Sequence, residues 1–179
     1  VDSLNQSGVG GTSFRPTAGA EIEKLFYAEI DTRNIRLSDF AIVGGRFGRN
    51  GPIWTAKVDA AIHLVGLSHV VERVRVGYVS GDGVWIGNRS ITPPPHYWIF
   101  WLQSNQISNC GGHGIRIEST DGFVLGNYSS GHAKGNVSYG AGNLWSNNHL
   151  DRVSDSEWAG LTVENQRGLE NTNVAETIM

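Results

Sequence analysis

ISNCGGHGIRIEST, residues 107 to 120, joins a short apolar start to a corner of small and polar residues, and then to a run that alternates apolar with polar residues. Alternation with a period of two is typical of a β-strand that buries one face. The glycines and asparagine between the two runs predict a turn. The stretch therefore predicts a strand, a corner and a second strand.

Alternating runs of the same kind recur along the chain. They are AAIHLVG (60 to 66), DGVWIGN (82 to 88), GNVSYG (135 to 140) and AGLTVEN (159 to 165), with an earlier copy in NIRLSD around Ile35. If Ile62, Val84, Ile115, Val137 and Leu161 are equivalent, the usual interval is 22 to 24 residues, and one longer interval separates Val84 from Ile115. A unit of this length cannot bury its own apolar face, so we expect stacked copies that share one core.

The form xNCxxxGIxI within residues 107 to 117 resembles the commonest signature of the pectate-lyase-like superfamily, and the resemblance extends over about residues 30 to 173. It implies an all-β fold, a right-handed parallel β-helix (solenoid) of about six turns. Two other folds use short strands and Gly-rich turns. The fixed interval disfavours a β-sandwich, and propeller blades repeat at about 40 residues or more.

The superfamily includes plant cell-wall lyases and hydrolases, and the tailspikes with which bacteriophages bind or degrade surface polysaccharide. The resemblance therefore implies a polysaccharide ligand, a homotrimer, and an extracellular or virion-surface location. Fold alone does not determine function, so these remain expectations to be weighed against the site.

The chain shows no internal boundary, and we expect one β-helix domain over 30 to 179 after an N-terminal extension or cap over 1 to 29. Within that extension, TAGAEIEKLFYAEI (17 to 30) has apolar residues at helix-like intervals. It predicts either a short helix that caps the first turn or an early strand over 26 to 30. Both ends look truncated, which indicates a fragment of a larger protein.

Composition excludes several classes of function. The net charge is -3 and the 14 Lys and Arg residues are scattered, which disfavours a nucleic-acid partner. Cys110 is the single cysteine, so neither an intrachain disulfide nor a zinc site with several thiolates is expected. The longest apolar run, Tyr97 to Leu102, is far below the roughly 20 residues of a membrane span. We expect no metal, no cofactor and no membrane insertion.

Strand alternation points Ile115 and Ile117 inward and Arg116 and Glu118 outward. Applied to every copy, this rule predicts two outward columns: Arg36, His63, Trp85, Arg116, Ser138 and Thr162 in one, and Ser38, Val65, Gly87, Glu118, Gly140 and Glu164 in the other. An aromatic ring beside charged groups suits sugar binding, because ring faces pack on apolar sugar faces while Arg and carboxylates bind hydroxyls or acidic groups. A solvated sheet face would also carry polar residues.

The long interval after Val84 places an inserted loop at NRSITPPPHYW (88 to 98). Three consecutive prolines cannot join an interior ladder and hold the segment extended, so the loop is predicted to form a wall beside Trp85. The alternative is a spacer or a contact with a neighbouring subunit. The predicted substrate-binding residues are His63, Trp85, Arg116, Tyr97 and Trp98.

Asp82 in SGDGV and His113 in GGHGI each lie two residues before an inward residue, so they are predicted to be neighbours whose protonation is coupled. Asp82 with Gly112, His113 and Gly114 resembles part of the polygalacturonase pattern, although residue 81 is Gly where that pattern has a second Asp.

Glu118 and Glu164 are predicted two turns apart in one column, about 9.6 Å between backbones. Carboxyls about 6.5 to 9.5 Å apart suit an inverting glycosidase. The candidate catalytic residues are Asp82, His113, Glu118 and Glu164. No cluster of carboxylates surrounds Arg116, so a calcium-dependent lyase is less expected than a hydrolase.

These patterns lead to two hypotheses of different classes, and a third from the partial motif. The first is a tailspike-like domain that binds a cell-surface polysaccharide and uses outward carboxylates to hydrolyse it. The second is a structural or oligomerisation module of a larger fibre or spike, without its own active site. The third is a polygalacturonase-like pectin hydrolase.

Overall fold

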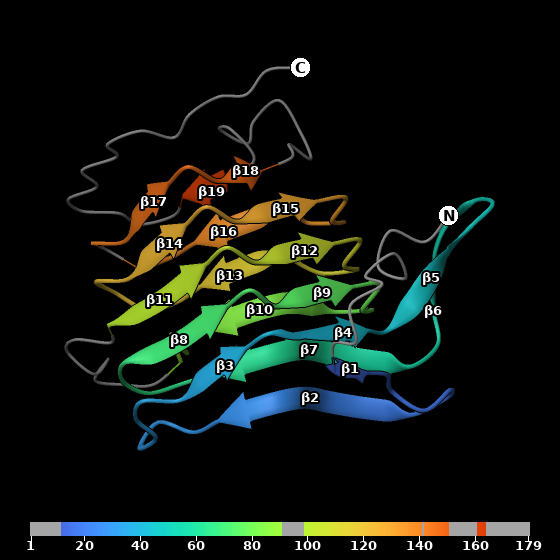
Figure 1. The fold of residues 1–179 in the computed structure, drawn as a ribbon, viewed down its shortest axis with the longest axis horizontal. Helices are drawn as coiled ribbons and strands as arrows, with labels where there is room; N and C mark the ends of the chain where they lie inside the picture. Colours follow the sequence, from blue (N-terminus) through green and yellow to red (C-terminus); the bar gives the residue numbers. More distant parts are fainter. Residues whose placement is uncertain (1–11, 91–98, 141, 151–160, 164–179) are drawn as a thin grey trace.

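The computed structural model describes residues 12–90, 99–140, 142–150 and 161–163. All regular structure in this part of the chain is β, arranged in three parallel sheets and one antiparallel hairpin (Figure 1). The first sheet has the order β1-β4-β9-β12-β15-β18, with β1 (Thr12–Phe14), β4 (Phe40–Val43), β9 (Arg75–Gly77), β12 (Gln106–Ser108), β15 (Tyr128–Ser130) and β18 (His149–Leu150). The second sheet has the order β2-β7-β10-β13-β16-β19, with β2 (Glu21–Ala28), β7 (Lys57–Leu64), β10 (Asp82–Ile86), β13 (Ile115–Ile117), β16 (Asn136–Ser138) and β19 (Leu161–Val163). The third sheet has the order β3-β8-β11-β14-β17, with β3 (Arg36–Ser38), β8 (His69–Glu72), β11 (Phe100–Gln103), β14 (Phe123–Leu125) and β17 (Leu144–Ser146).

Successive strands enter the three sheets in rotation. From β7 onward the chain passes through the second, third and first sheets, and then begins the same sequence again at β10, β13 and β16. Figure 1 shows the resulting levels, with β2 at the bottom and β17 to β19 near the top. Val84 pairs with Ile115 and with Ile62, as the repeat predicts. The expected all-β fold with parallel strands is therefore confirmed.

The core lies between the three sheets and consists of stacked aliphatic side chains. Residues with no or almost no exposure come from every sheet: Ile62, Val84 and Ile115 from the second, Val71, Leu102 and Val124 from the third, and Val76 and Ile107 from the first. Each fully buried aliphatic side chain contributes about 1.5 to 3 kcal/mol by leaving water. Because each level contributes only a few such residues, stability depends on the contact between levels.

A repeated corner links the third sheet to the first. Arg73, Ser104, Gly126 and Asn147 occupy equivalent positions, and their φ angles are 52°, 55°, 61° and 56°. We call these four residues the left-handed corner. A left-handed backbone is unfavourable for residues other than glycine, so the surrounding structure must hold it in place.

The residues after the left-handed corner provide that support. Asn105, Asn127 and Asn148 form an asparagine ladder: their side-chain oxygens accept the main-chain N–H of Val74, Asn105 and Asn127 at 3.0, 3.0 and 2.9 Å, respectively. Their amides donate to the carbonyls of Val71, Leu102 and Val124 at 2.9, 2.8 and 2.8 Å. The buried polar groups at this corner are thereby paired from level to level.

The hairpin of β5 (Gly45–Gly48) and β6 (Gly51–Trp54) projects beyond the sheets (Figure 1). It exposes large apolar side chains, with Phe47 61%, Ile53 45% and Trp54 44% exposed. A two-stranded hairpin has little stability of its own, so these side chains are a candidate contact surface. The described residues include no helix that is long and apolar enough to cross a membrane.

The structure decides between the two alternatives that the sequence left open for the N-terminal segment. Of the two structures predicted within residues 17 to 30, the capping helix is absent and a strand is present, since residues 21 to 28 form β2, which begins earlier than the predicted strand and pairs in parallel with β7. Phe26 and Ala28 stack on Ile62 and Leu64, so the apolar residues serve the sheet core rather than a helix face. The division of the chain at residue 29 remains a prediction.

A prediction that is wrong concerns four members of the outward columns: Arg36 and Ser38, which lie in the third sheet, and Ser138 and Gly140, which are displaced by one residue. Arg36 lies in β3 of the third sheet and pairs with Val70, so Tyr27 takes its place beside His63. In β16, Val137 pairs with Arg116, and Ser138 pairs with Ile117. The strand is thus shifted by one residue, because the buried polar residues Asn136 and Ser138 face inward where Val137 was expected.

Candidate functional site

One outward row of side chains crosses four strands of the second sheet. Tyr27 pairs with His63, His63 with Trp85, and Trp85 with Arg116. The Tyr27 and His63 ring centroids are 5.5 Å apart, and His63 stacks on Trp85 at 3.8 Å with an 8° angle between the planes. The Arg116 guanidinium lies 4.0 Å from the centroid of the Trp85 ring. We call these four residues the ring stack.

The ring stack determines which surfaces are open to a ligand. His63 covers one face of Trp85 and Arg116 covers the other, so Trp85 presents only its edge. His63 is 1% exposed, whereas Tyr27 is 49% exposed. Tyr27, at the end of the stack, is therefore its most accessible ring, and the Lys24 ammonium lies over this ring, 4.4 Å from its centroid.

His63 is held as a neutral imidazole within the stack. Its Nε2 lies 2.9 Å from the Gly87 carbonyl and donates to it. Burial lowers the pKa of His63, and the hydrogen bond to Gly87 only partly opposes this effect. The neutral His63 ring therefore lies between the rings of Tyr27 and Trp85 and contacts both.

Arg116 is also the centre of a charged cluster. Its guanidinium binds Glu118 Oε1 through Nε at 3.0 Å and through Nη2 at 2.6 Å, and binds Asp82 Oδ2 through Nη1 at 3.2 Å. Asp82 and Glu118 are 7% and 8% exposed. Burial opposes the charged guanidinium, but the hydrogen bonds to Glu118 and the nearby carboxylates raise the pKa of Arg116.

The remaining oxygens of both acids are satisfied as well. Asp82 Oδ1 accepts the main-chain N–H of His113 at 2.8 Å. Glu118 Oε2 accepts the Trp85 indole N–H and the Arg89 main-chain N–H, both at 3.1 Å. The two carboxylates are therefore fixed on either side of Arg116, and they link it to the main chain.

His113 lies next to Asp82, but the contact differs from the predicted one. Asp82 binds the main chain of His113 rather than its ring. Burial lowers the pKa of His113, against the attraction of Asp82. The flanking glycines have structural roles, because a Cβ at Gly112 would collide with Asp82 and one at Gly114 would collide with His132. Packing therefore explains the two glycines of the Gly-His-Gly sequence.

The predicted site residues are only partly brought together. His63, Asp82, Trp85, His113, Arg116 and Glu118 lie on β7, β10, β13 and their adjoining corners. Glu164, Tyr97 and Trp98 lie outside the described residues, as does most of the predicted proline-rich wall. The shift in β16 also places Tyr139 rather than Gly140 beside Glu118, since the Tyr139 N–H bonds the Ile117 carbonyl.

Sequence reasoning missed three members of this face. Tyr27 lay in the segment predicted as a cap or an early strand, Arg89 lay in the predicted loop, and Tyr139 was given no role. The Arg89 guanidinium lies 4.1 Å from the centroid of the Tyr139 ring and 3.6 Å from Glu118 Oε1. The alternating tyrosine in EIEKLFYA was the available signal for Tyr27, and the helix-like spacing obscured it.

No family model, curated protein or solved structure matches the chain in the three comparisons. Among the described residues, no group of three or more His, Cys, Asp or Glu side chains has the arrangement of a metal site. The functional assignment therefore depends on the chemistry of the outward faces.

A buried hydrogen-bond chain lies behind this face, in the core. Cys110 N–H donates to His132 Nδ1 at 3.3 Å, so the ring proton is on Nε2, which donates to Ser129 Oγ at 2.9 Å. The Ser129 hydroxyl then donates to Asn136 Oδ1 at 2.6 Å. Burial, followed by the nearby His113, lowers the pKa of His132 from 6.5 to about 4.

This chain predicts acid sensitivity. Between pH 6.5 and about 4 the unfolded His132 takes up a proton while the folded ring does not. Stability is therefore full above pH 6.5 and falls as the pH decreases, by about 3 kcal/mol for this residue. Urea unfolding at a series of pH values measures the loss. In His132→Gln the slope should be smaller, and equal slopes in the two proteins would contradict the assignment.

Proposed function

We propose that the chain is a right-handed parallel β-helix that binds a cell-surface polysaccharide on the outer face of the second sheet. The β-helix is supported by strands that enter three parallel sheets in rotation, and by the recurring interval in the sequence. Such a domain would serve a tailspike-like protein outside the cell or on a virion.

The observation that carries the binding proposal is the continuous contact from Tyr27 to Arg116. The row spans three strand-to-strand steps, about 14 Å, which is long enough to follow several sugar units. Stacking and ion pairs fix its side chains before any ligand arrives, so binding costs little side-chain entropy. The exposed ring of Tyr27 can pack on the apolar face of a sugar, and the half-exposed guanidinium of Arg89 can donate hydrogen bonds to its hydroxyls or acidic groups.

The same geometry favours binding over hydrolysis. A glycosidase of the two-carboxylate type needs one carboxylic acid to protonate the leaving group and one carboxylate to activate water or attack the sugar. Here Asp82 and Glu118 share one guanidinium and are almost fully buried. We assign both to the positioning of Arg116.

We expect Tyr27→Ala to weaken polysaccharide binding by about tenfold, the loss of one stacked ring in a binding face. The measurement is affinity for members of a panel of bacterial capsular and O-antigen polysaccharides that the unaltered protein binds. Phe47→Ala, which removes an exposed ring from the hairpin, is the matched control, and at the same oligomeric state as the unaltered protein it should leave affinity unchanged. If the folded protein bound no member of the panel, or if both variants bound equally, the proposal would be wrong.

A second candidate function is assembly, and the hairpin is the observation that favours it. Phe47, Ile53 and Trp54 expose apolar surface on this projecting hairpin. If this surface joins copies of the chain into a trimer, sedimentation should show a trimer in the unaltered protein. The substitution Phe47→Ser should then give monomers, and a monomeric unaltered protein would exclude this role.

A further inference from the structure

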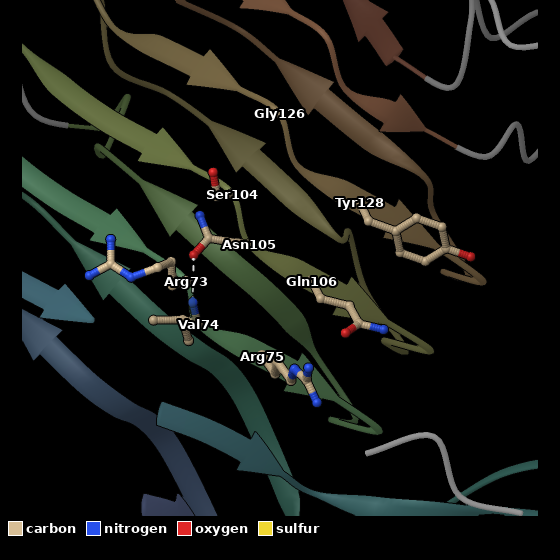
Figure 2. A pocket seen from close by; sticks show the side chains of 8 residues that line it. All are labelled: Arg73, Val74, Arg75, Ser104, Asn105, Gln106, Gly126 and Tyr128. Carbon is tan, nitrogen blue, oxygen red and sulfur yellow. Dashed lines mark hydrogen bonds between the residues drawn. The ribbon is translucent and has the colours of Figure 1, made fainter. Parts of the chain in front are cut away.

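A groove runs along the corner between the third and first sheets, away from the ring stack. It encloses about 330 Å³ and is lined by residues from three successive levels of the first sheet and its corner, including Arg75, Gln106 and Tyr128 (Figure 2). These three lie in register, since Arg75 pairs with Gln106 and Gln106 pairs with Tyr128. Figure 2 shows all three side chains projecting to the same side of the corner, while Arg73 projects to the other.

The groove is basic. Its lining contains two arginines and no acidic residue. Arg73 is neutralised by Asp39 at 2.7 Å and by Glu72 at 3.1 Å. Arg75 differs, because none of the described residues forms an ion pair or a hydrogen bond with its guanidinium. An unpaired guanidinium on the wall of a groove favours an anionic ligand, and carboxylates match its forked donors.

The other two side chains favour a sugar rather than a bare anion. Tyr128 is 42% exposed, and His149 covers one face of its ring at 4.8 Å with a 6° angle between the planes. Since His149 and Gln106 lie on opposite neighbouring strands, the uncovered face of Tyr128 is on the Gln106 side. A ring face beside an amide binds the apolar face and the hydroxyls of a sugar.

The floor of the groove is rigid. Arg73, Ser104 and Gly126 of the left-handed corner line it, and Asn105 of the asparagine ladder lies among them. Because Asn105 bonds the main chain of the level before and Asn127 of the level after, the spacing between levels is fixed. A ligand therefore meets a preformed row of contacts, which lowers the entropic cost of binding.

We propose that this groove is a second carbohydrate site, and that it binds a uronate unit of an acidic polysaccharide. The Arg75 guanidinium pairs with the sugar carboxylate, Gln106 bonds the hydroxyls, and the open face of Tyr128 packs on the ring. The site is on a different sheet from the ring stack, so it operates whether or not the face around Tyr27 binds a ligand.

Calorimetric titration with uronate tetramers tests the proposal. The probes are mannuronate, glucuronate and galacturonate tetramers, each compared with the neutral tetramer made by reducing its carboxylates. We expect at least one acidic tetramer to bind, and its reduced counterpart to bind at least tenfold more weakly. Failure of all three acidic tetramers, or equal affinity for an acidic tetramer and its neutral partner, would overturn the proposal.

Variants locate the site. Arg75→Gln should lower affinity for the acidic tetramer at least tenfold, and Tyr128→Ala should lower affinity for it as well, with unchanged urea unfolding midpoints. Arg46→Gln, a matched change on the exposed hairpin, should have no effect. Tyr27→Ala should also have none, and binding lost in Tyr27→Ala but kept in Arg75→Gln would place the ligand on the second sheet. Inorganic phosphate that competes as strongly as the tetramer would show a bare anion site and overturn the sugar assignment.

Discussion

Replacing Arg116 with methionine is expected to lower the free energy of unfolding by about 3 to 5 kcal/mol. The substitution keeps the length of the side chain and part of its packing on Trp85, but removes the guanidinium. Asp82 and Glu118, 7% and 8% exposed, would then remain buried as two adjacent negative charges without their common partner. Urea denaturation at neutral pH measures the change.

Two further variants separate the buried charge effect from a general loss of packing. Arg89→Met removes a guanidinium whose side chain is 55% exposed, and should cost no more than about 1 kcal/mol. Adding Asp82→Asn and Glu118→Gln to Arg116→Met should restore part of the lost stability, because no buried charge is then left unpaired. A loss below 1 kcal/mol in Arg116→Met would show that water reaches the two carboxylates.

Asn127→Ala is expected to cost about 4 kcal/mol, since it interrupts the asparagine ladder at its centre. The side chain accepts the Asn105 N–H at 3.0 Å and donates to the Leu102 carbonyl at 2.8 Å. Alanine leaves both main-chain groups buried without partners, at about 1 to 3 kcal/mol each, and adds a small cavity. The free energy of unfolding in urea again provides the measurement.

Asn50→Ala is the matched control for the ladder, because Asn50 is an exposed residue in the turn of the hairpin. It should change stability by no more than about 0.5 kcal/mol. Similar losses in the two variants, or a loss below 1 kcal/mol in Asn127→Ala, would mean that the ladder does not hold the levels together.

The sequence predicts most of the sheet register, because inward positions are periodic and aliphatic. Ile62, Val84 and Ile115 are each followed by a larger polar or aromatic residue, and they pair as expected. The prediction fails at Val137, which is buried but pairs with Arg116, because the register of this strand follows hydrogen bonding rather than hydrophobicity. Asn136 faces the core because its side-chain oxygen accepts the Ile115 N–H and the Ser129 hydroxyl, which no pattern of apolar residues reveals.

The sequence predicted several residues of the candidate site, but not how their side chains contact one another. The alternation placed His63, Trp85 and Arg116 in one row, and the pairing agrees. The closed sandwich around Trp85 depends on side-chain rotamers and on the 3.8 Å stacking distance, neither of which the sequence encodes in a readable form. The hydrogen bonds of the Arg116 guanidinium to both Asp82 and Glu118 likewise depend on side-chain conformations.

The left-handed corner has a broader consequence for how such a protein can change over time. Arginine, serine, glycine and asparagine all adopt nearly the same φ there, within 52° to 61°. The shape of the corner therefore does not depend on the side chain that occupies it. The exposed side chains at this corner, and with them the ligands that the surface binds, can therefore change during evolution while the backbone of the corner stays the same.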